Sequence, residues 1–99
     1  MARLDVYANP DGAGWLVDVQ ADLLGHLNTR LVVPLLPQSI APVPAKTLNP
    51  CFEVAGETVV MTTQFMAAVP AAILRDPVTS LRPQRDEITA ALDFLMQGF

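Results

Sequence analysis

The side chains that could do chemistry are few in this sequence, and they do not form a catalytic set. The chain contains one histidine, His26, and one cysteine, Cys51. A metal site needs three or four suitable ligands, and a catalytic base needs a nucleophile and an orienting partner beside it. The sequence therefore predicts no metal, no cofactor and no enzyme activity. We expect His26 on the surface and Cys51 in the core, as a small apolar residue.

Acidic residues are the remaining candidates for acid–base chemistry, and they occur as three close pairs. A pair of carboxylates becomes catalytic when burial or mutual repulsion shifts one pKa. The surrounding sequence places these pairs at strand ends, at a turn and at a helix start, where solvated acids are common. We therefore expect none of them to be catalytic. The pairs are Asp18 with Asp22, Glu53 with Glu57, and Asp86 with Glu87.

The charge balance argues against a nucleic-acid partner. The chain has 6 Lys and Arg against 10 Asp and Glu, which gives a formal net charge of −4. Affinity for nucleic acid comes mainly from cations that neutralise phosphates, and these cations are scattered along the chain. We expect no direct binding of DNA or RNA, although folding could still bring a few of them together. They are Arg3, Arg30, Lys46, Arg75, Arg82 and Arg85.

Other features of the sequence predict the compartment. The N-terminal residues lack the apolar core of a signal peptide, and a lone cysteine excludes an intrachain disulfide. The longest apolar stretch, residues 66–74, is about half a membrane span and contains Pro70. We expect a cytoplasmic protein without a membrane segment.

The elements that must position these residues are mostly strands. Residues 4–7 and 15–20 alternate between apolar and polar types on either side of a turn at residues 9–12, which predicts an N-terminal hairpin. Residues 31–33 predict a central strand. The next segment, residues 34–50, contains five prolines. Because proline removes backbone donors, we expect an ordered loop there and no central strand or helix running through it.

The second half of the chain predicts one more hairpin and one helix. Residues 52–54 and 59–61 flank a turn, whereas the local structure of residues 66–70 stays open. Pro83 suits the first position of a helix and Gly98 suits its C-terminal stop. Apolar residues between them recur at spacings of three and four, which gives one apolar face. They are Ile88, Ala91, Leu92, Leu95, Met96 and Phe99.

The overall composition predicts a second buried surface. Hydrophobic residues make up 52% of the 99 residues and charged residues only 16%. A chain of this length forms a single domain, residues 1–99, whose core is too small to hide so much apolar material. A two-fold interface with a second copy is the commonest solution, so we expect a homodimer.

Several stretches of the chain together resemble the CcdB family of gyrase-poisoning toxins. The stretches are collinear and span nearly the whole chain, and their order is more specific than any one of them. The resemblance implies a mostly β (β+α) fold, a homodimeric SH3-like antiparallel barrel with one C-terminal α-helix. The matching stretches are residues 6–7, 17–20, 22, 30–35, 56–57, 61–63 and 66–70, and the terminal helix that ends in Gly98.

The resemblance also implies a function and partners. It implies the toxin of a type II toxin–antitoxin pair, which binds the A subunit of DNA gyrase while its DNA is cleaved and is neutralised by a partly disordered antitoxin. In the family the last three residues, a tryptophan, a glycine and an isoleucine, contact gyrase. The matching positions here are Gln97, Gly98 and Phe99. Gly98 is kept and Phe99 is an apolar replacement, whereas Gln97 supplies neither the contact area nor the stacking of an aromatic ring.

Alternatives stay open at the level of the sequence. Gln97 suggests a CcdB-like protein that dimerises and binds an antitoxin but has lost gyrase poisoning. A MazF-type endoribonuclease shares the barrel by fold analogy only, and it would need a cationic groove to which Arg30 contributes. Leu95 is expected to pack in the core, whereas for Phe99 core packing and gyrase contact both stay open. The turn at residues 9–12 and the strand after it are an expected edge for the antitoxin.

Overall fold

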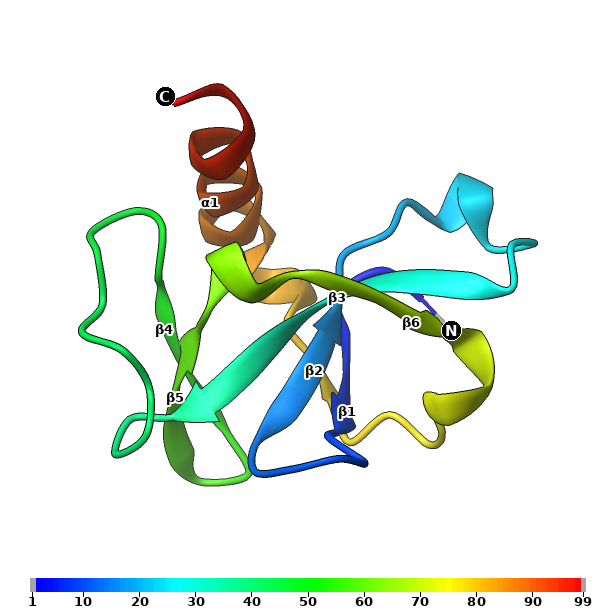
Figure 1. Cartoon of the computed structure of the whole chain (residues 1–99), viewed down its shortest axis with the longest axis horizontal. Coiled ribbons are helices and arrows are strands. Elements are labelled where there is room, and N and C mark those ends of the chain that lie inside the picture. Colours follow the sequence, from blue (N-terminus) through cyan, green and yellow to red (C-terminus); the bar gives the residue numbers. More distant parts are fainter. Residues whose placement is uncertain (1, 99) are drawn as a thin grey trace.

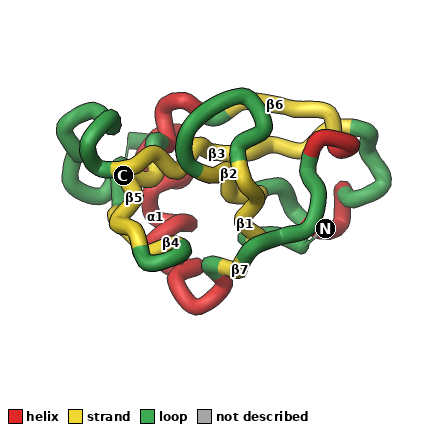
Figure 2. The backbone as a smooth tube through the Cα atoms, turned by 90° about the horizontal axis from the view of Figure 1, so that it is seen from below, coloured by secondary structure: helices red, strands yellow, loops and turns green. Residues whose placement is uncertain are grey.

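The computed structural model of the chain describes residues 2–98 and is a curled antiparallel sheet followed by one α-helix (Figure 1). The strands pair in the order β4-β5-β3-β2-β1-β7, and β6 pairs with a further part of β3. Figure 2 shows the strands as a nearly closed ring, in which β4 and β7 are the two ends of the sheet. The predicted mostly β barrel with one C-terminal helix is confirmed. The strands are β1 (Asp5–Ala8), β2 (Trp15–Asp18), β3 (Thr29–Pro37), β4 (Cys51–Val54), β5 (Glu57–Met61), β6 (Ala67–Pro70) and β7 (Thr79–Ser80), and the helix is α1 (Arg85–Gln97).

The predicted N-terminal hairpin is present as β1 and β2, which pair with Val6 opposite Val17. Its turn contains Gly14, which has a φ of +83°. A Cβ atom at this position would lie 2.2 Å from the carbonyl oxygen of Leu35. Only glycine fits this close approach to β3, so the turn fixes how the hairpin meets the rest of the sheet.

β3 is the central strand of the fold, and it is longer than predicted. It pairs with β2 along one edge and with β5 and β6 along the other. It runs through Pro34, so the expectation that no central strand enters the proline-rich segment was wrong. Pro34 is opposite Leu16 of β2, and on the other edge of β3 it lies between the residues that pair with β6 and those that pair with β5. On that edge no strand residue is paired with Pro34, so its missing N–H group interrupts no ladder there. Its carbonyl oxygen accepts hydrogen bonds from the backbone N–H and the hydroxyl of Thr62, both at 2.9 Å.

The second predicted hairpin is confirmed as β4 and β5. Its turn residues, Ala55 and Gly56, have φ values of +53° and +79°, as a tight hairpin turn with the right-handed twist requires. Along β4 the side chains alternate, so Phe52 and Val54 are buried while Cys51 is exposed. The prediction that Cys51 is a core residue was therefore wrong, because the pleat directs its side chain outward.

The remaining proline-rich segment, residues 38–50, forms a loop, as predicted, and contains no strand. Its order depends on Asn49, which is buried. The side-chain oxygen of Asn49 accepts a hydrogen bond from the Ala45 N–H at 3.0 Å, and its amide nitrogen donates to the Met61 carbonyl at 3.0 Å. One side chain thus ties the loop to the end of β5.

The open segment at residues 66–70 forms β6, which pairs antiparallel with β3 from Thr29 opposite Pro70 to Val32 opposite Ala67. Most residues of β6 are exposed. A 3-10 turn, Thr63–Phe65, precedes β6 and contacts α1. β6 therefore lies at the surface of the barrel on the side where α1 leaves it.

The C-terminal helix ends at Gly98 as predicted, but the α-helix begins at Arg85, two residues after the predicted start at Pro83. Pro83 lies in a short 3-10 turn, Arg82–Gln84, that leads directly into α1. Gly98 has a left-handed φ of +82°, and its N–H donates to the Phe94 carbonyl at 2.9 Å. α1 covers the barrel through Ile88 and Ala91, which belong to its main apolar cluster. None of the helices in residues 2–98 is long and apolar enough to cross a membrane.

Candidate functional site

The two halves of α1 lie in different surroundings. Ile88 and Ala91 in the first half are completely buried. In the second half the same apolar stripe continues, but Met96 is 69% exposed, and Phe94, on another face of the helix, is 38% exposed. The end of α1 extends away from the strands (Figure 1). An apolar stripe that outruns the core it covers indicates a surface for a partner.

Two of the three residues predicted to contact gyrase lie at this exposed end. Gln97 is the last residue of α1 and Gly98 is its left-handed cap, and both are exposed. Phe99 lies outside the described residues. Leu95, which was predicted to pack in the core, is half-buried. The structure thus brings Gln97 and Gly98 together with exposed Met96.

A further exposed apolar side chain lies on the segment that contacts α1. Phe65, at the end of the 3-10 turn that contacts α1, is 50% exposed. It is followed by the mostly exposed strand β6, which pairs only with β3 among the described strands. We call the second half of α1, Phe65 and β6 the helix-end surface. It combines exposed apolar side chains with a free strand edge.

A second group of exposed apolar residues was missed by the sequence reasoning. Leu23, Leu24 and Leu27 all lie in the loop between β2 and β3, and Leu23 is 89% exposed. Two adjacent leucines in a polar stretch outside any periodic segment were the available signal. The exposed leucines do not pack in the core of their own chain, so they form a second apolar surface available for contact.

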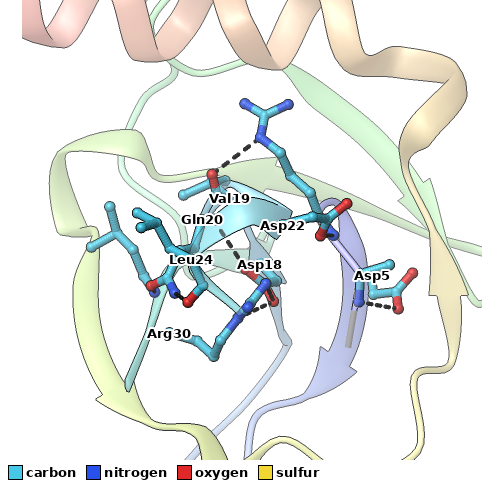
Figure 3. A network of polar contacts seen from close by, with 10 residues as sticks. Asp5, Asp18, Val19, Gln20, Asp22, Leu24 and Arg30 are labelled. Atoms are coloured by element: carbon cyan, nitrogen blue, oxygen red, sulfur yellow. Dashed lines mark hydrogen bonds and ion pairs between the residues drawn. The ribbon is translucent and has the colours of Figure 1, made fainter. Parts of the chain in front are cut away.

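Beneath the loop lies the only ion pair between two fully buried side chains in the part of the chain that the structure describes. Arg30 donates from Nε to Oδ2 of Asp18 at 2.8 Å, and its Nη2 lies 2.6 Å from the same oxygen as a less aligned ionic contact. Arg30 is 1% exposed and Asp18 is 0% exposed. The expectation that Asp18 is a solvated acid was wrong, because Arg30 compensates its charge from the neighbouring strand. Figure 3 shows the two side chains meeting.

Burial and pairing act on the pKa of Asp18 in opposite directions. Burial raises the pKa of this carboxyl above its ordinary value of 3.8, and the hydrogen bonds from Arg30 and from the Gln20 N–H lower it in part. The burial effect is the larger, so the net direction is upward. Burial also raises the pKa of the Tyr7 phenol, whose hydroxyl has no hydrogen-bond partner among the described residues. The pKa of each group is therefore above the ordinary value for its residue type.

Gln20 links the ion pair to the loop that contains Leu23, Leu24 and Leu27, and we call its three hydrogen bonds the clamp. Its backbone N–H donates to Oδ1 of Asp18 at 3.0 Å. Its side-chain oxygen accepts from the Leu31 N–H at 3.0 Å, and its side-chain nitrogen donates to the Leu24 carbonyl at 3.0 Å. Figure 3 shows Gln20, Leu24 and Asp18 in this arrangement. The clamp joins β2, the loop and β3. Its hydrogen bonds hold the backbone of the loop that carries the exposed leucines against the barrel.

The other side chains considered for chemistry are separated from one another. His26 is exposed, as predicted. Five of the six acids in the three predicted pairs are exposed, and Asp18 is the exception. Within residues 2–98 no group of three His, Cys, Asp or Glu side chains could hold a metal ion. Arg30, the cation considered for RNA cleavage, is buried against Asp18 rather than placed in an open groove.

Comparisons with known proteins agree with this architecture. A family model described as "CcdB protein" matches residues 3–98. Among solved structures, the chain is similar to an endoribonuclease in complex with its cognate antitoxin from a mycobacterial species. That match has a TM-score of 0.76 at 16% sequence identity and covers 97% of this chain and 94% of the other. At this identity the likeness establishes a shared fold.

Proposed function

Because the chain belongs to the CcdB family, we propose that it is the toxin of a type II toxin–antitoxin pair, which binds the A subunit of DNA gyrase and traps the complex with cleaved DNA. The observation that carries this proposal is the apolar stripe of α1, which outruns the barrel and ends in exposed Met96, Gln97 and Gly98. A poison of this kind performs no chemistry itself. It needs a fixed, exposed contact surface.

The end of α1 has the properties of a contact surface. Its helical backbone is rigid up to Gly98, so a partner meets side chains whose positions are already set. The last turn contains no basic residue, and the carbonyl groups at the end of a helix carry partial negative charge. We therefore expect the partner to bring an apolar pocket for Met96 and a cationic side chain for the helix end.

We propose that the protein is a homodimer and that the helix-end surface forms the interface. β6 has a free edge, and Phe65 and Met96 both expose apolar side chains. Burial of apolar surface contributes roughly 25 cal/mol per Å² removed from water, so a two-fold pairing here would stabilise a small barrel appreciably. It would also bring two helix ends together in one gyrase-binding surface.

The proposal includes a cognate antitoxin with a disordered segment and a cytoplasmic location. The expected antitoxin edge at β2 was wrong, because β2 is paired on both sides, with β1 and with β3. Strand addition by a flexible peptide needs a free edge. In the sheet of the described residues, the free edges outside the helix-end surface belong to β4 and β7.

A plasmid cleavage assay tests the gyrase proposal. Purified protein is incubated with gyrase of the same cell, ATP and plasmid, and the reaction is stopped with detergent and protease. We expect linear DNA with the full chain and none after removal of residues 98–99, while Arg75→Ala, an exposed change elsewhere, retains full activity. Unchanged cleavage by a folded chain that lacks residues 98–99 would contradict the assigned site.

Gln97 supports a second candidate, a family member that binds an antitoxin without poisoning gyrase. An interface hot spot typically contributes about 2–4 kcal/mol, or roughly 30- to 1,000-fold in affinity. If the folded full-length protein gives no linear DNA and Gln97→Trp restores cleavage, the second candidate replaces the first.

The endoribonuclease alternative is supported only by the fold that the chain shares with a solved endoribonuclease. The burial of Arg30 counts against it, because a cation that is 1% exposed does not reach an RNA phosphate. RNA cleavage by the purified protein that disappears in Arg30→Met, with folding preserved, would revive it.

A further inference from the structure

The structure gathers half of the scattered cations into one cavity. A cavity of about 190 Å³ is lined by Arg3, Leu4, Asp22, Arg82 and Arg85. Its three arginines are half of the 6 Lys and Arg in a chain of net charge −4. With Asp22 the cavity lining has a formal charge of +2, three positive and one negative. We call this cavity the arginine pocket.

Backbone hydrogen bonds explain how distant arginines meet. Leu4 is buried and has a left-handed φ of +72°, which is unfavourable for a residue with a side chain. Its N–H donates to the Asp18 carbonyl at 2.6 Å, and its carbonyl accepts from the Leu81 N–H at 2.9 Å. This pairing places Arg3, the neighbour of Leu4, beside Arg82, the neighbour of Leu81. The pocket is therefore held by the fold on both sides.

The guanidinium groups in the pocket are only partly used by the protein itself. Arg3 donates from Nε to the Val19 carbonyl at 3.2 Å, which fixes its direction, and its backbone N–H donates to Oδ1 of Asp22 at 2.7 Å. Arg85 is 71% exposed, and its Nε lies 4.0 Å from the Asp86 carboxylate, the outer limit of an ion pair. The Nη groups of Arg3 and Arg85 thus remain able to bind an anion.

We propose that the arginine pocket binds carboxylates of an acidic peptide segment in a protein partner. The planar guanidinium groups match carboxylates in two-point hydrogen bonds. The negative net charge of the chain opposes a long polyanion such as DNA, whereas a short acidic segment meets mainly the local positive charge. The cavity volume also suits single side chains rather than a duplex. Asp22 in the lining repels a singly charged carboxylate less than a doubly charged phosphate monoester.

The inference goes beyond the proposed function, and the pocket lies apart from the proposed gyrase contact. The pocket is at the N-terminal end of α1 and Gln97 is at the other end, about 20 Å away for 13 residues at 1.5 Å each. A short peptide at the arginine pocket therefore leaves Gln97 and Gly98 uncovered. Its test requires neither gyrase nor an antitoxin, so failure of one proposal does not imply failure of the other.

The experiment measures fluorescence anisotropy of a labelled hexaglutamate peptide, with hexaglutamine as the uncharged reference. The full chain is compared with Arg82→Ala/Arg85→Ala and with a control of equal charge change, Lys46→Ala/Arg75→Ala. All four substituted residues are exposed, so both double variants are expected to fold, which circular dichroism checks. We expect the pocket variant to bind hexaglutamate about 5- to 10-fold more weakly, and the control variant to bind within about twofold of the full chain.

Two results would overturn the proposal. Equal weakening in both double variants would mean that hexaglutamate responds to net charge and not to the pocket. A single-stranded oligonucleotide that binds more tightly than hexaglutamate, and that the pocket variant alone no longer binds, would make this a phosphate site for nucleic acid. Binding of hexaglutamate that falls only in the pocket variant and weakens with added salt supports the peptide assignment.

Discussion

The start of β3 and the free end of α1 place charged and apolar side chains in opposite environments. Beside β3, two charged side chains are fully buried and compensate each other, Asp18 with Arg30. At the end of α1, Met96 is left in solvent although the core lies one or two turns away. A buried ion pair constrains how strands join, whereas exposed apolar residues stabilise nothing in the isolated chain. The comparison separates residues that specify the fold from residues available to a partner.

The largest effect is expected from breaking the buried pair on one side only. Arg30→Met leaves the Asp18 carboxylate buried without its partner, which typically costs about 3–5 kcal/mol of unfolding free energy. Urea denaturation measures this loss. Arg75→Met, at an exposed position, is the matched control and should stay within about 0.5 kcal/mol of the unchanged protein.

Removing both charges of the pair sharpens the same test. Asp18→Asn combined with Arg30→Met leaves no uncompensated charge, so it should recover part of the stability lost in Arg30→Met alone. If the loss of unfolding free energy in the double variant equals the sum of the losses in the two single variants, Asp18 and Arg30 do not stabilise the fold as a pair.

The second prediction compares the two halves of α1. Ile88→Ala removes a fully buried side chain and should lower the unfolding free energy by about 2–5 kcal/mol. Met96→Ala changes an exposed side chain and should alter the unfolding free energy of the monomer by about 0.5 kcal/mol or less. Thermal and urea unfolding at low protein concentration measure both variants. A large loss in Met96→Ala under these conditions would show that the helix end packs on its own barrel.

A smaller effect is expected from pH, with a sign fixed by the raised pKa of Asp18. Below its ordinary pKa of 3.8 this residue is protonated in both the folded and the unfolded chain. Between 3.8 and the raised value only the folded chain keeps the proton, so the stability contributed by Asp18 falls as pH rises through this window. The slope is at most about 1.4 kcal/mol per pH unit for one proton.

The pH prediction is tested by urea denaturation from about pH 3 to about pH 7, with Asp18→Asn as the comparison. The difference in unfolding free energy between the two proteins should change in favour of Asp18→Asn as pH rises, and then level off. A difference that changes in the opposite sense would mean that Arg30 outweighs burial and holds the pKa of Asp18 below its ordinary value.

The smallest effect is expected at Cys51. Its side chain is exposed on β4, so Cys51→Ala should change the unfolding free energy by no more than about 0.5 kcal/mol. Its neighbour Phe52 is buried, and Phe52→Ala should cost about 3–5 kcal/mol. Similar losses at the two positions in urea denaturation would contradict the strand register of β4.

Local patterns predicted most of the fold. The two hairpins, the ordered proline-rich loop and the C-terminal end of α1 depend on turn residues and periodicity, which lie within a few residues of one another. The misreadings at Pro34 and Asp18 concern contacts with other strands, and the misreading at Cys51 concerns which face of β4 points inward. Whether Pro34 lacks a needed N–H depends on where the partner strand changes, and whether Asp18 is solvated depends on Arg30 twelve positions along the chain.

The candidate sites also divide into those indicated by the local sequence and those that depend on contacts between distant residues. The family resemblance led to Gln97 and Gly98, and the structure places both at an exposed end. The arginine pocket was not predictable in detail, because Arg3 and Arg82 meet through a backbone hydrogen bond between Leu4 and Leu81. The exposure of Leu23 was also not predictable, because the sequence of a loop does not show whether its leucine side chains point inward or outward.

The position of β3 also has a consequence for the order in which the protein forms during synthesis. Its partner β2 precedes it in the chain, but β5 and β6 follow it and end at Met61 and Pro70. While the ribosome is still adding those residues, the meander of β1, β2 and β3 can form with one long edge of β3 exposed. Such an edge is a template for pairing with other chains. The absent N–H group of Pro34 interrupts that edge near its middle, so a nascent chain offers its neighbours two short ladders instead of one long one.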